Sequence, residues 1–358
     1  MFSFKSNKIT HIHPEALQSQ ARWIILTDNQ IKFIPSTIGR CSNLQKCMLS
    51  GNLLEKVPSE ITNCHNLELI RLASNHLKEP PMELLQLPNL SWVAFSSNPF
   101  LTDPEDYDDS GNEEIHLKVF QDDHLDDASK GIELGKGASG ITRQYTLGIN
   151  EKGTEDKIQI PVAVKEYYSN ITSDGNPQEE RKVAMIASSL GCKSLVNVFG
   201  KTQKSNLIME LLKDYSVLAG PPSLESCSRD VYDEGIIVSD ERAIALVGHL
   251  LQALTKLHEA GICHGDFYGH NILISNTDEN HAWLTDFGAA FIYDVKSDYG
   301  ELIESAERRA FSYLVSEVQN LVRSDNLPLK ESLGDFARLC KEQTFTELRN
   351  TWSTLKMQ

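Results

Sequence analysis

The sequence predicts an α/β solenoid of short repeats followed by an α+β domain with two lobes. Three observations predict this architecture: a 23-residue period that runs to about residue 100, an acidic segment after it, and a second half in which glycine, lysine and aspartate motifs alternate with apolar runs. The length of 358 residues agrees, because a chain of this size usually forms about two domains. We therefore divide the chain into residues 1–100, 101–128 and 129–358.

The composition is that of a folded protein, with 40% hydrophobic and 23% charged residues. The formal net charge of −16 argues against binding to nucleic acid or to an anionic membrane surface, because both need clustered Lys and Arg. No run approaches the roughly 18 apolar residues of a membrane span, and the N-terminus lacks the apolar core of a secretory leader. The seven cysteines show no CxxC spacing, so we expect reduced, mostly buried thiols. We expect a cytoplasmic protein with no nucleic-acid or membrane partner.

Asparagine recurs every 23 residues in the first part of the chain, at Asn29, Asn52, Asn75 and Asn98. An apolar residue precedes each by three positions and a proline follows three of them by six: Leu26, Leu49, Leu72, Phe95, Pro35, Pro58 and Pro81. One such unit cannot bury its own apolar face, so neighbouring units must stack, and the asparagine amides can bond the backbone of adjacent turns as a ladder. The pattern resembles the leucine-rich repeat in its 23-residue form, over roughly residues 1–100.

In such a repeat, the residues between the strand leucines project from the concave face of the sheet. They are Trp23, Ile25, Lys46, Met48, Leu69, Arg71, Trp92 and Ala94. Aromatic residues and arginine are typical of protein interfaces, so we expect this face to bind a protein ligand. The residues expected to contact that ligand are Trp23, Met48, Leu69, Arg71 and Trp92. The alternative is that Trp92 packs beneath the segment that follows.

Residues 101–128 are predicted to be a charged linker. Eleven acidic residues lie between Asp103 and Asp127, against the single base Lys118. Like charges repel one another and the segment lacks an apolar period, except for a short predicted strand at 115–120. The acidic residues also lack the alternating spacing and the turn glycine of an EF-hand loop, so a calcium site is not expected.

The second unit begins with IELGKGASGITRQYTL, in which Leu134 is followed by Gly135, Gly137 and Gly140. Glycines at this spacing let a backbone approach phosphates, but the pattern alone is weak. A dinucleotide-binding fold needs a helix directly after the last glycine, whereas here strand-forming residues follow. A second strand then ends in VAVK, at Lys165.

Two further motifs make the pattern specific. One is HGDFYGHN, which contains Asp266 and Asn271, and the other is LTDFG, which contains Asp286. A glycine-rich hairpin, VAVK, HGDxxxxN and DFG in this order resemble the protein kinase family. Together with the repeats, the chain is similar to small leucine-rich repeat protein kinases.

The kinase resemblance implies a small lobe at 129–212 and a large lobe at 213–358, with ATP and Mg²⁺ as cofactors. It implies that Lys165 holds the ATP phosphates and pairs with a glutamate of the helix at 178–190, either Glu179 or Glu180. Asp266 would accept or orient the substrate hydroxyl, and Asn271 and Asp286 would bind Mg²⁺. The nucleotide would also contact Leu134, the three glycines and the segment from Glu210 to Leu212.

The sequence departs from the kinase pattern in its catalytic loop. Gly265 replaces the arginine that grips a phosphorylated activation loop, so we expect activity without prior phosphorylation. Tyr268 replaces the lysine that is usual in serine/threonine kinases, and the residues usual in tyrosine kinases are absent too, so the choice between serine/threonine and tyrosine stays open. There is no APE triplet, and the helix near residue 301 shows no match to the aspartate that braces the catalytic loop. We interpret His264 as a structural residue beside the DFG turn and His270 as an exposed loop residue.

Three functions remain open from the residues. The first is phosphoryl transfer from ATP to a protein hydroxyl, on serine or threonine, with the repeats recruiting partners. The second is a small-molecule phosphotransferase of the HGD type, since a reduced peptide platform suits it. The third is a nucleotide-binding scaffold without transfer, which the full set of Lys165, Asp266, Asn271 and Asp286 disfavours.

Overall fold

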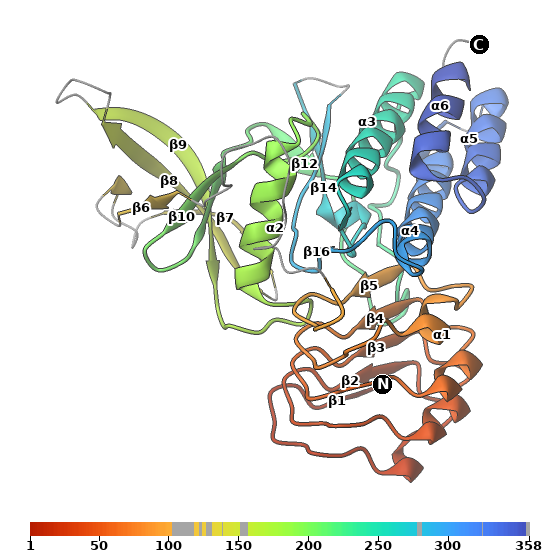
Figure 1. Ribbon diagram of the computed structural model, residues 1–358. Coiled ribbons are helices and arrows are strands. Elements are labelled where there is room, and N and C mark those ends of the chain that lie inside the picture. Colours follow the sequence, from red (N-terminus) through yellow and green to blue (C-terminus); the bar gives the residue numbers. More distant parts are fainter. Residues whose placement is uncertain are drawn as a thin grey trace.

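The protein is described here from a computed structural model. It describes residues 1–101, 118–121, 124–126, 131–137, 139–150, 157–277, 281–323 and 325–355. Figure 1 shows a stack of repeats that carries a two-lobed unit, with the small lobe to one side and the long helices of the large lobe to the other.

The N-terminal unit is built on a five-stranded parallel sheet whose order is β1-β2-β3-β4-β5. Its strands are β1 (Phe2–Ser3), β2 (Trp23–Ile25), β3 (Lys46–Met48), β4 (Leu69–Arg71) and β5 (Trp92–Ala94). Successive strands are connected through short helical turns at Pro14–Ala16, Ser36–Arg40 and Ser59–Asn63 and through helix α1 (Met82–Leu85). Strands β2 to β5 pair residue for residue at a distance of 23 along the chain, as the sequence period predicts.

The repeated asparagines form the predicted ladder. Asn75 Nδ2 donates to the carbonyl of Leu49 in the preceding turn at 3.0 Å and to Leu72 O at 2.9 Å. Its Oδ1 accepts from the backbone of Leu54 at 3.0 Å, and Asn52 and Asn98 repeat this pattern. The asparagines therefore satisfy backbone groups that would otherwise be buried without partners.

The small lobe is a six-stranded sheet with one helix. The strand order is β6-β10-β11-β9-β8-β7. The elements are β6 (Val119–Phe120), β7 (Ile132–Lys136), β8 (Gly140–Asn150), β9 (Lys157–Tyr167), α2 (Pro177–Ser189), β10 (Val198–Thr202) and β11 (Leu207–Glu210). Asn176 caps α2, since its side chain accepts from the backbone of Gln178 and Pro177 opens the first turn.

The large lobe is mainly helical. Its helices are α3 (Asp240–Glu259), α4 (Gly300–Leu321), α5 (Leu327–Leu339) and α6 (Phe345–Leu355). Its short strands are β12 (Tyr215–Val217), β13 (Ile262–Cys263), β14 (Ile272–Ser275), β15 (Ala282–Leu284) and β16 (Phe291–Ile292). The predicted helix near residue 301 is α4, which begins at Gly300.

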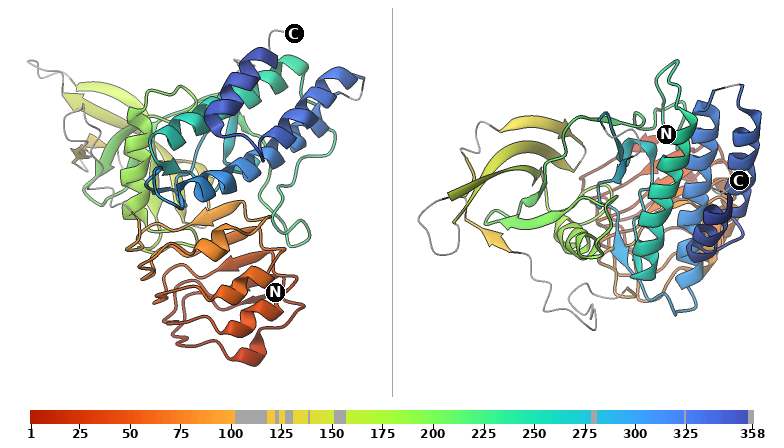
Figure 2. Two further views of the ribbon diagram at one scale, coloured as in Figure 1. Left: turned by 45° about the vertical axis from the view of Figure 1, so that its right-hand side comes forward. Right: turned by 90° about the horizontal axis from the view of Figure 1, so that it is seen from above.

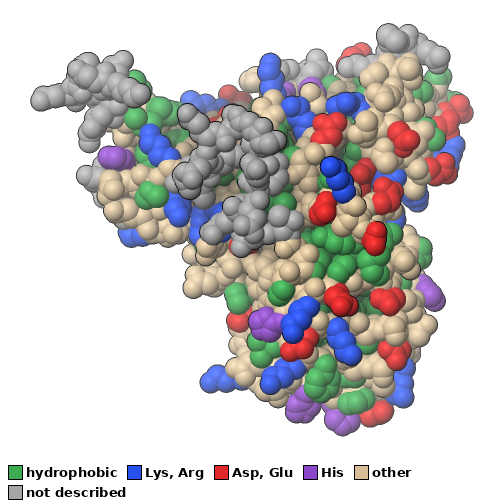
Figure 3. Space-filling model, viewed as in Figure 1, with side chains coloured by type: hydrophobic (Ala, Val, Ile, Leu, Met, Phe, Trp, Pro, Cys, Tyr) green, Lys and Arg blue, Asp and Glu red, His purple; other side chains and the backbone are tan. Residues whose placement is uncertain are grey.

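The apolar core is continuous between the repeats and the large lobe. Phe95 of the repeats packs edge-on against Phe291 of β16, with ring centroids 5.7 Å apart. Tyr293 and Ile303 join the repeat core, and Leu69 and Trp92 of the repeats join the core of the large lobe. Figure 2 shows the two units in close contact from two further directions, and Figure 3 shows hydrophobic side chains gathered at the surface where they meet.

This packing corrects the prediction of a free binding face on the repeats. Leu69, Arg71 and Trp92 are 3%, 1% and 2% exposed, because the large lobe covers them. Trp23 and Met48 are half-buried; Trp23 donates to the sulfur of Cys227, and Met48 packs against the large-lobe core. The face that was expected to bind a separate protein instead contacts the chain's own second unit. The alternative for Trp92 is burial beneath the segment that follows; Trp92 is buried, but the residues that cover it, Tyr268 and Tyr313, belong to the large lobe.

Other predictions about the chain have mixed outcomes. All seven cysteines are free and buried, as expected. Most of the predicted linker at 101–128 lies outside the described residues, including 102–117, but the end of the predicted strand at 115–120 is present as β6. Within the described parts of the chain, no helix is long and apolar enough to cross a membrane.

Candidate active site

A cleft of about 880 Å³ lies between the two lobes. Every predicted site residue except Glu179 lines it. The lining includes Leu134, Gly135, Gly137, Gly140, Lys165, Glu180, Glu210, Leu212, Asp266, Asn271 and Asp286. Residues scattered over more than 150 positions of the chain thus lie together in one cleft.

Lys165 of β9 lies at the centre of two ion pairs in this cleft. Its Nζ is 2.6 Å from Glu180 Oε1 and 2.8 Å from Asp286 Oδ1. Of the two glutamates left open by the sequence, Glu180 is therefore the partner, and Glu179 is half-buried at the neighbouring position of α2. The two pairs join β9 to α2 and to the loop after β15.

The charges of these groups depend on one another. Burial alone would lower the pKa of Lys165, yet the carboxylates of Asp286 and Glu180 raise it well above its ordinary value. Burial alone would raise the pKa of Asp286, yet the charge and hydrogen bond of Lys165 lower it to about 2. For Glu180 burial is the stronger effect and raises the pKa. At neutral pH the cleft therefore holds a charged lysine against a charged aspartate.

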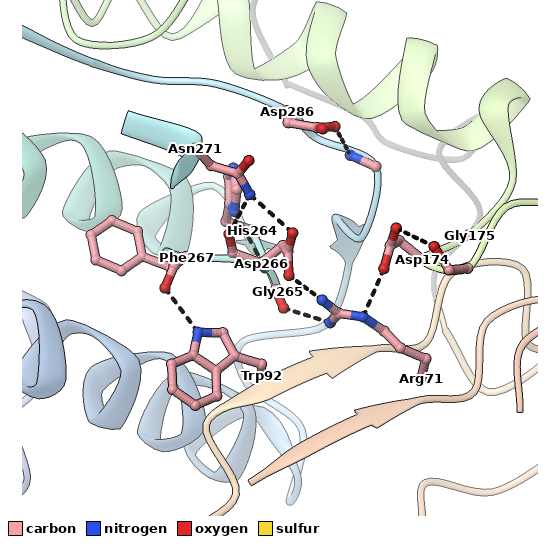
Figure 4. Close-up of polar contacts among 12 residues, drawn as sticks. Arg71, Trp92, Asp174, Gly175, His264, Gly265, Asp266, Phe267, Asn271 and Asp286 are labelled. Carbon is pink, nitrogen blue, oxygen red and sulfur yellow. Dashed lines mark hydrogen bonds and ion pairs between the residues drawn. The ribbon is translucent and has the colours of Figure 1, made fainter. Parts of the chain in front are cut away.

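Asp266 is held from two sides, by Asn271 of its own motif and by Arg71 of the repeats. Asn271 Nδ2 donates to Asp266 Oδ2 and to its carbonyl, each at 2.9 Å. Arg71, from β4 of the repeats, forms an ion pair with Asp266 Oδ1, and Figure 4 shows these groups converging on the carboxylate. The side chain of Asp266 remains 17% exposed, so it is held in place but still reaches the cleft.

The two histidines of this motif have different outcomes. His264 is fully buried; its Nε2 lies 3.0 Å from the carbonyl of Thr285, and its ring packs against Phe287, which confirms the structural interpretation. The prediction of an exposed His270 is wrong, because it is half-buried and its Nδ1 lies 2.7 Å from Asp230 Oδ1. That partner comes from the long loop between β12 and α3.

Glu307 of α4 braces the catalytic loop, and the sequence reasoning missed it. Its carboxylate accepts from the backbone nitrogens of Gly265 at 2.6 Å and His264 at 3.0 Å, and lies 2.7 Å from His258 Nε2. Burial would raise the pKa of this carboxyl, but the His258 hydrogen bond and the charges of His258 and His264 hold it below its ordinary value. The available signal was an acidic residue on the apolar face of a helix, between Ile303 and Phe311.

The glycine-rich hairpin and the segment after β11 close the cleft from the small lobe. A Cβ at Gly140 would lie 2.2 Å from the carbonyl oxygen of Glu166, whereas at Gly135 and Gly137 it would meet no atom within 4 Å. Gly140 is thus required by the hairpin, and the other two leave open space over the cleft. The carboxylate of Glu210 accepts from Asn197 N and Nδ2 at 2.9 Å each, and Glu210 N donates to the carbonyl of Asn197 at 2.9 Å. Three hydrogen bonds therefore hold Glu210 against Asn197 at the edge of the cleft.

Comparison with known proteins agrees with this geometry. Residues 129–318, more than half of the chain, match the protein kinase domain family. Over 169 residues, 46% of this chain and 38% of the relative, it is 27% identical to a protein named as a probable myosin light chain kinase of Dictyostelium discoideum. Over 170 residues, 47% of this chain and 30% of the relative, it is 30% identical to a protein named as a probable serine/threonine-protein kinase of the same organism.

A third relative is the serine/threonine-protein kinase vps15 of Schizosaccharomyces pombe, which is 30% identical over 103 residues, 28% of this chain and 6% of that protein. The chain spans less than two fifths of the length of these curated relatives. The family match extends from just before the glycine-rich hairpin to residue 318 in the last turn of α4, and it contains the ion pairs of Lys165 and the loop of Asp266. The chain therefore belongs to the protein kinase family.

Proposed function

We propose that the chain transfers the γ-phosphoryl group of ATP to a hydroxyl of a protein substrate, on serine or threonine. The observation that carries the proposal is the assembled cleft, in which Lys165 is paired with Glu180 and Asp286 opposite a fixed Asp266. The names of two of the three relatives support serine/threonine specificity.

In this proposal each cleft residue has one task. Lys165 binds the α and β phosphates, and Glu180 holds its ammonium group in place. Asp266 orients the substrate hydroxyl and receives its proton, since its carboxylate is fixed and partly exposed. The open space over Gly135 and Gly137 lets the backbone of the hairpin approach the phosphates. Phosphoryl transfer needs mainly such positioning and charge stabilisation.

The residues present also fit Mg²⁺. Asn271 uses its Nδ2 for Asp266, which leaves its amide oxygen as a donor, and Figure 4 shows that oxygen turned away from Asp266. The Asp286 side chain is 43% exposed toward the cleft. Carboxylate and amide oxygens are the donors that Mg²⁺ prefers, and the bound ion would neutralise charge on the phosphates.

The same proposal assigns residues 1–100 to a leucine-rich repeat domain, 101–128 to a linker, and 129–358 to the kinase domain with lobes at 129–212 and 213–358. The 23-residue period, the parallel strands and the asparagine ladder support the first assignment.

Transfer of labelled phosphate from ATP tests the proposal. Wild type, Asp266→Asn and Lys165→Met are compared with Mg²⁺ on a generic protein, on a serine- and a threonine-containing peptide, and on a panel of small alcohols. The proposal predicts label on protein and peptide that falls by about 1,000-fold or more in both variants. Asp266→Asn should keep its affinity for ADP, which shows that its site remains folded.

Two results would contradict the proposal. Label on small alcohols alone would make the chain a small-molecule phosphotransferase. ADP binding without any transfer would make it a nucleotide-binding scaffold.

A further inference from the structure

We infer that Arg71, which comes from the repeats, is a positioning residue of the phosphoryl-transfer site and that the repeat unit is thereby part of that site. The inference rests on the proposed function, and it adds a residue from outside the kinase domain. Arg71 lies on β4 and is separated from Asp266 by 195 positions along the chain.

The three nitrogens of the Arg71 guanidinium bind three different groups. Its Nη2 donates to Asp266 Oδ1, its Nη1 donates to the carbonyl of Gly265 at 2.8 Å, and its Nε donates to Asp174 Oδ1 at 3.0 Å. The planar fork of an arginine fixes the relative positions of the groups that it binds. Figure 4 shows the side chain reaching from the sheet into this space between the lobes.

The charge of Arg71 is matched by these contacts. The side chain is 1% exposed, and a buried cation is strongly unfavourable unless it is paired. Burial alone would lower the pKa of the guanidinium, but the carboxylates of Asp266 and Asp174 raise it above its ordinary value. Arg71 therefore stays charged beside Asp266.

The catalytic loop is shaped to accept the repeats. Gly265 has φ +72°, and a Cβ there would lie 2.2 Å from the carbonyl oxygen of Val93 on β5. The arginine usual at this position would collide with the repeat sheet. Glycine at position 265 thus permits the close approach of β5.

The second departure in the loop also contacts the repeats. The ring of Tyr268 stacks on Trp92 of β5 with centroids 4.3 Å apart and planes 5° from parallel. Trp92 Nε1 donates to the carbonyl of Phe267 at 2.8 Å. Tyr268 occupies the position of the lysine that is usual two residues after the catalytic aspartate. The repeats supply a different cation, Arg71, which pairs with the Asp266 carboxylate.

The contact with Asp174 extends this effect to the small lobe. Asp174 lies between β9 and α2, two residues before the cap of the helix that carries Glu180. A Cβ at Gly175 would lie 2.8 Å from Ser96 Oγ of the repeats and 2.8 Å from the carbonyl of Gly288. Arg71 thus joins the catalytic loop to the segment that leads into α2, the helix that carries Glu180.

The test compares wild type with Arg71→Gln and Arg71→Lys in the full-length chain. The measurements are kcat and KM for phosphate transfer to a generic protein, the Kd of ADP and the unfolding midpoint, with kinetics at least about 10 °C below each midpoint. Arg309→Gln is the matched control. Arg309 of α4 also crosses the interface, since its Nε donates to the carbonyl of Leu90 at 2.7 Å, but it lies outside the cleft lining.

We expect Arg71→Gln to lower kcat about 100-fold while the Kd of ADP changes less than about twofold. Arg71→Lys keeps a buried cation but not the fork, so its kcat should recover to about 10-fold below wild type. Arg309→Gln should keep kcat within about twofold even if its midpoint falls. A purely structural role of Arg71 would move the midpoint and leave kcat of the folded protein unchanged.

Several outcomes would overturn the inference. A kcat of folded Arg71→Gln or Arg71→Lys within about twofold of wild type would do so, and a raised kcat would make Arg71 a brake instead. If wild type transfers phosphate and Asp266→Asn does not, the proposed function stands whatever the Arg71 variants show. Absence of transfer by wild type would contradict both the proposed function and the inference about Arg71.

Discussion

Single buried residues hold the catalytic loop, and Glu307 shows this most clearly. Its carboxylate accepts two backbone hydrogen bonds from the loop and one from His258. Replacement by glutamine removes the charge and one acceptor oxygen, so donors would be left buried without partners.

We predict that Glu307→Gln lowers the free energy of unfolding by about 3 kcal/mol and lowers kcat as well. Glu301→Gln on the same helix is the control, because the Glu301 side chain is 61% exposed and its pair with Arg308 contributes less than about 1 kcal/mol. Urea unfolding measures the free energy of unfolding of both variants, and phosphate transfer measures their kcat. Equal losses for the two variants would show that the loop does not depend on Glu307.

Gly265 is a residue at which the backbones of the loop and of the repeats approach closely. Alanine there would combine the strain of φ +72° with the collision against Val93 O. We predict that Gly265→Ala lowers kcat at least about 10-fold with little change in ADP affinity. Gly235→Ala is the control, since Gly235 has φ +81° but a Cβ there would meet no atom within 4 Å. A similar loss of kcat in both variants would assign the effect to backbone strain alone.

At the scale of elements, helix α4 carries a buried carboxyl group, Glu317, whose ionisation is unfavourable in the folded protein. Burial raises the pKa of Glu317 to about 7, against the hydrogen bond from Tyr232 Oη at 2.8 Å, with Asp230 raising it further and Arg229 lowering it. The folded protein binds this proton more tightly than the unfolded chain. Its contribution to stability is therefore fully present below pH 4.5, the ordinary pKa, and is lost as the pH rises through about 7.

We predict that Glu317→Gln, which is neutral at every pH, is more stable than wild type above pH 7 by on the order of 1 kcal/mol. The difference should vanish as the pH falls to about 4.5. Unfolding midpoints between pH 4.5 and 8 measure it, with Glu331→Gln on the exposed face of α5 as the control. A difference that does not change with pH would refute the assigned cause.

Most elements could be predicted from the sequence, because each has a local signal. The 23-residue period gives the strands of the repeats, and the glycines with VAVK give β7, β8 and β9. The choice between Glu179 and Glu180 could not be made, since it depends on how α2 is rotated about its axis by tertiary packing. Glu307 was missed because two of its partners are backbone nitrogens, which the sequence does not identify, and the third, His258, lies 49 positions away along the chain.

At the scale of the whole molecule, the interface between the repeats and the kinase domain could not be predicted. Trp92 and Arg71 have the composition of a protein-binding face, and composition does not tell whether the partner is another protein or the same chain. The physical sign was in the loop itself. Gly265 and Tyr268 are the positions at which it departs from the kinase pattern, and both contact the repeats.

The repeats also hold the segment after the DFG motif. Ala289 packs with Ala73 and Ala94 of the repeats, and Phe291 packs against Phe95. Since these contacts fix the segment without a phosphate group, we predict that phosphatase treatment leaves the rate of substrate phosphorylation unchanged. Intact mass measures the removal of phosphate. A rate that falls with dephosphorylation and returns with rephosphorylation would contradict this prediction.

The central claim is that the repeats act on phosphoryl transfer through Asp266. It is tested most directly by the rate constant of a single turnover in wild type, Arg71→Gln, Asp266→Asn and the double variant. If Arg71 acts through the Asp266 carboxylate, the Arg71→Gln change should lower the rate about 100-fold in wild type and less than about threefold in Asp266→Asn. Loss by the same factor in both backgrounds would contradict the claim, because the two residues would then act independently.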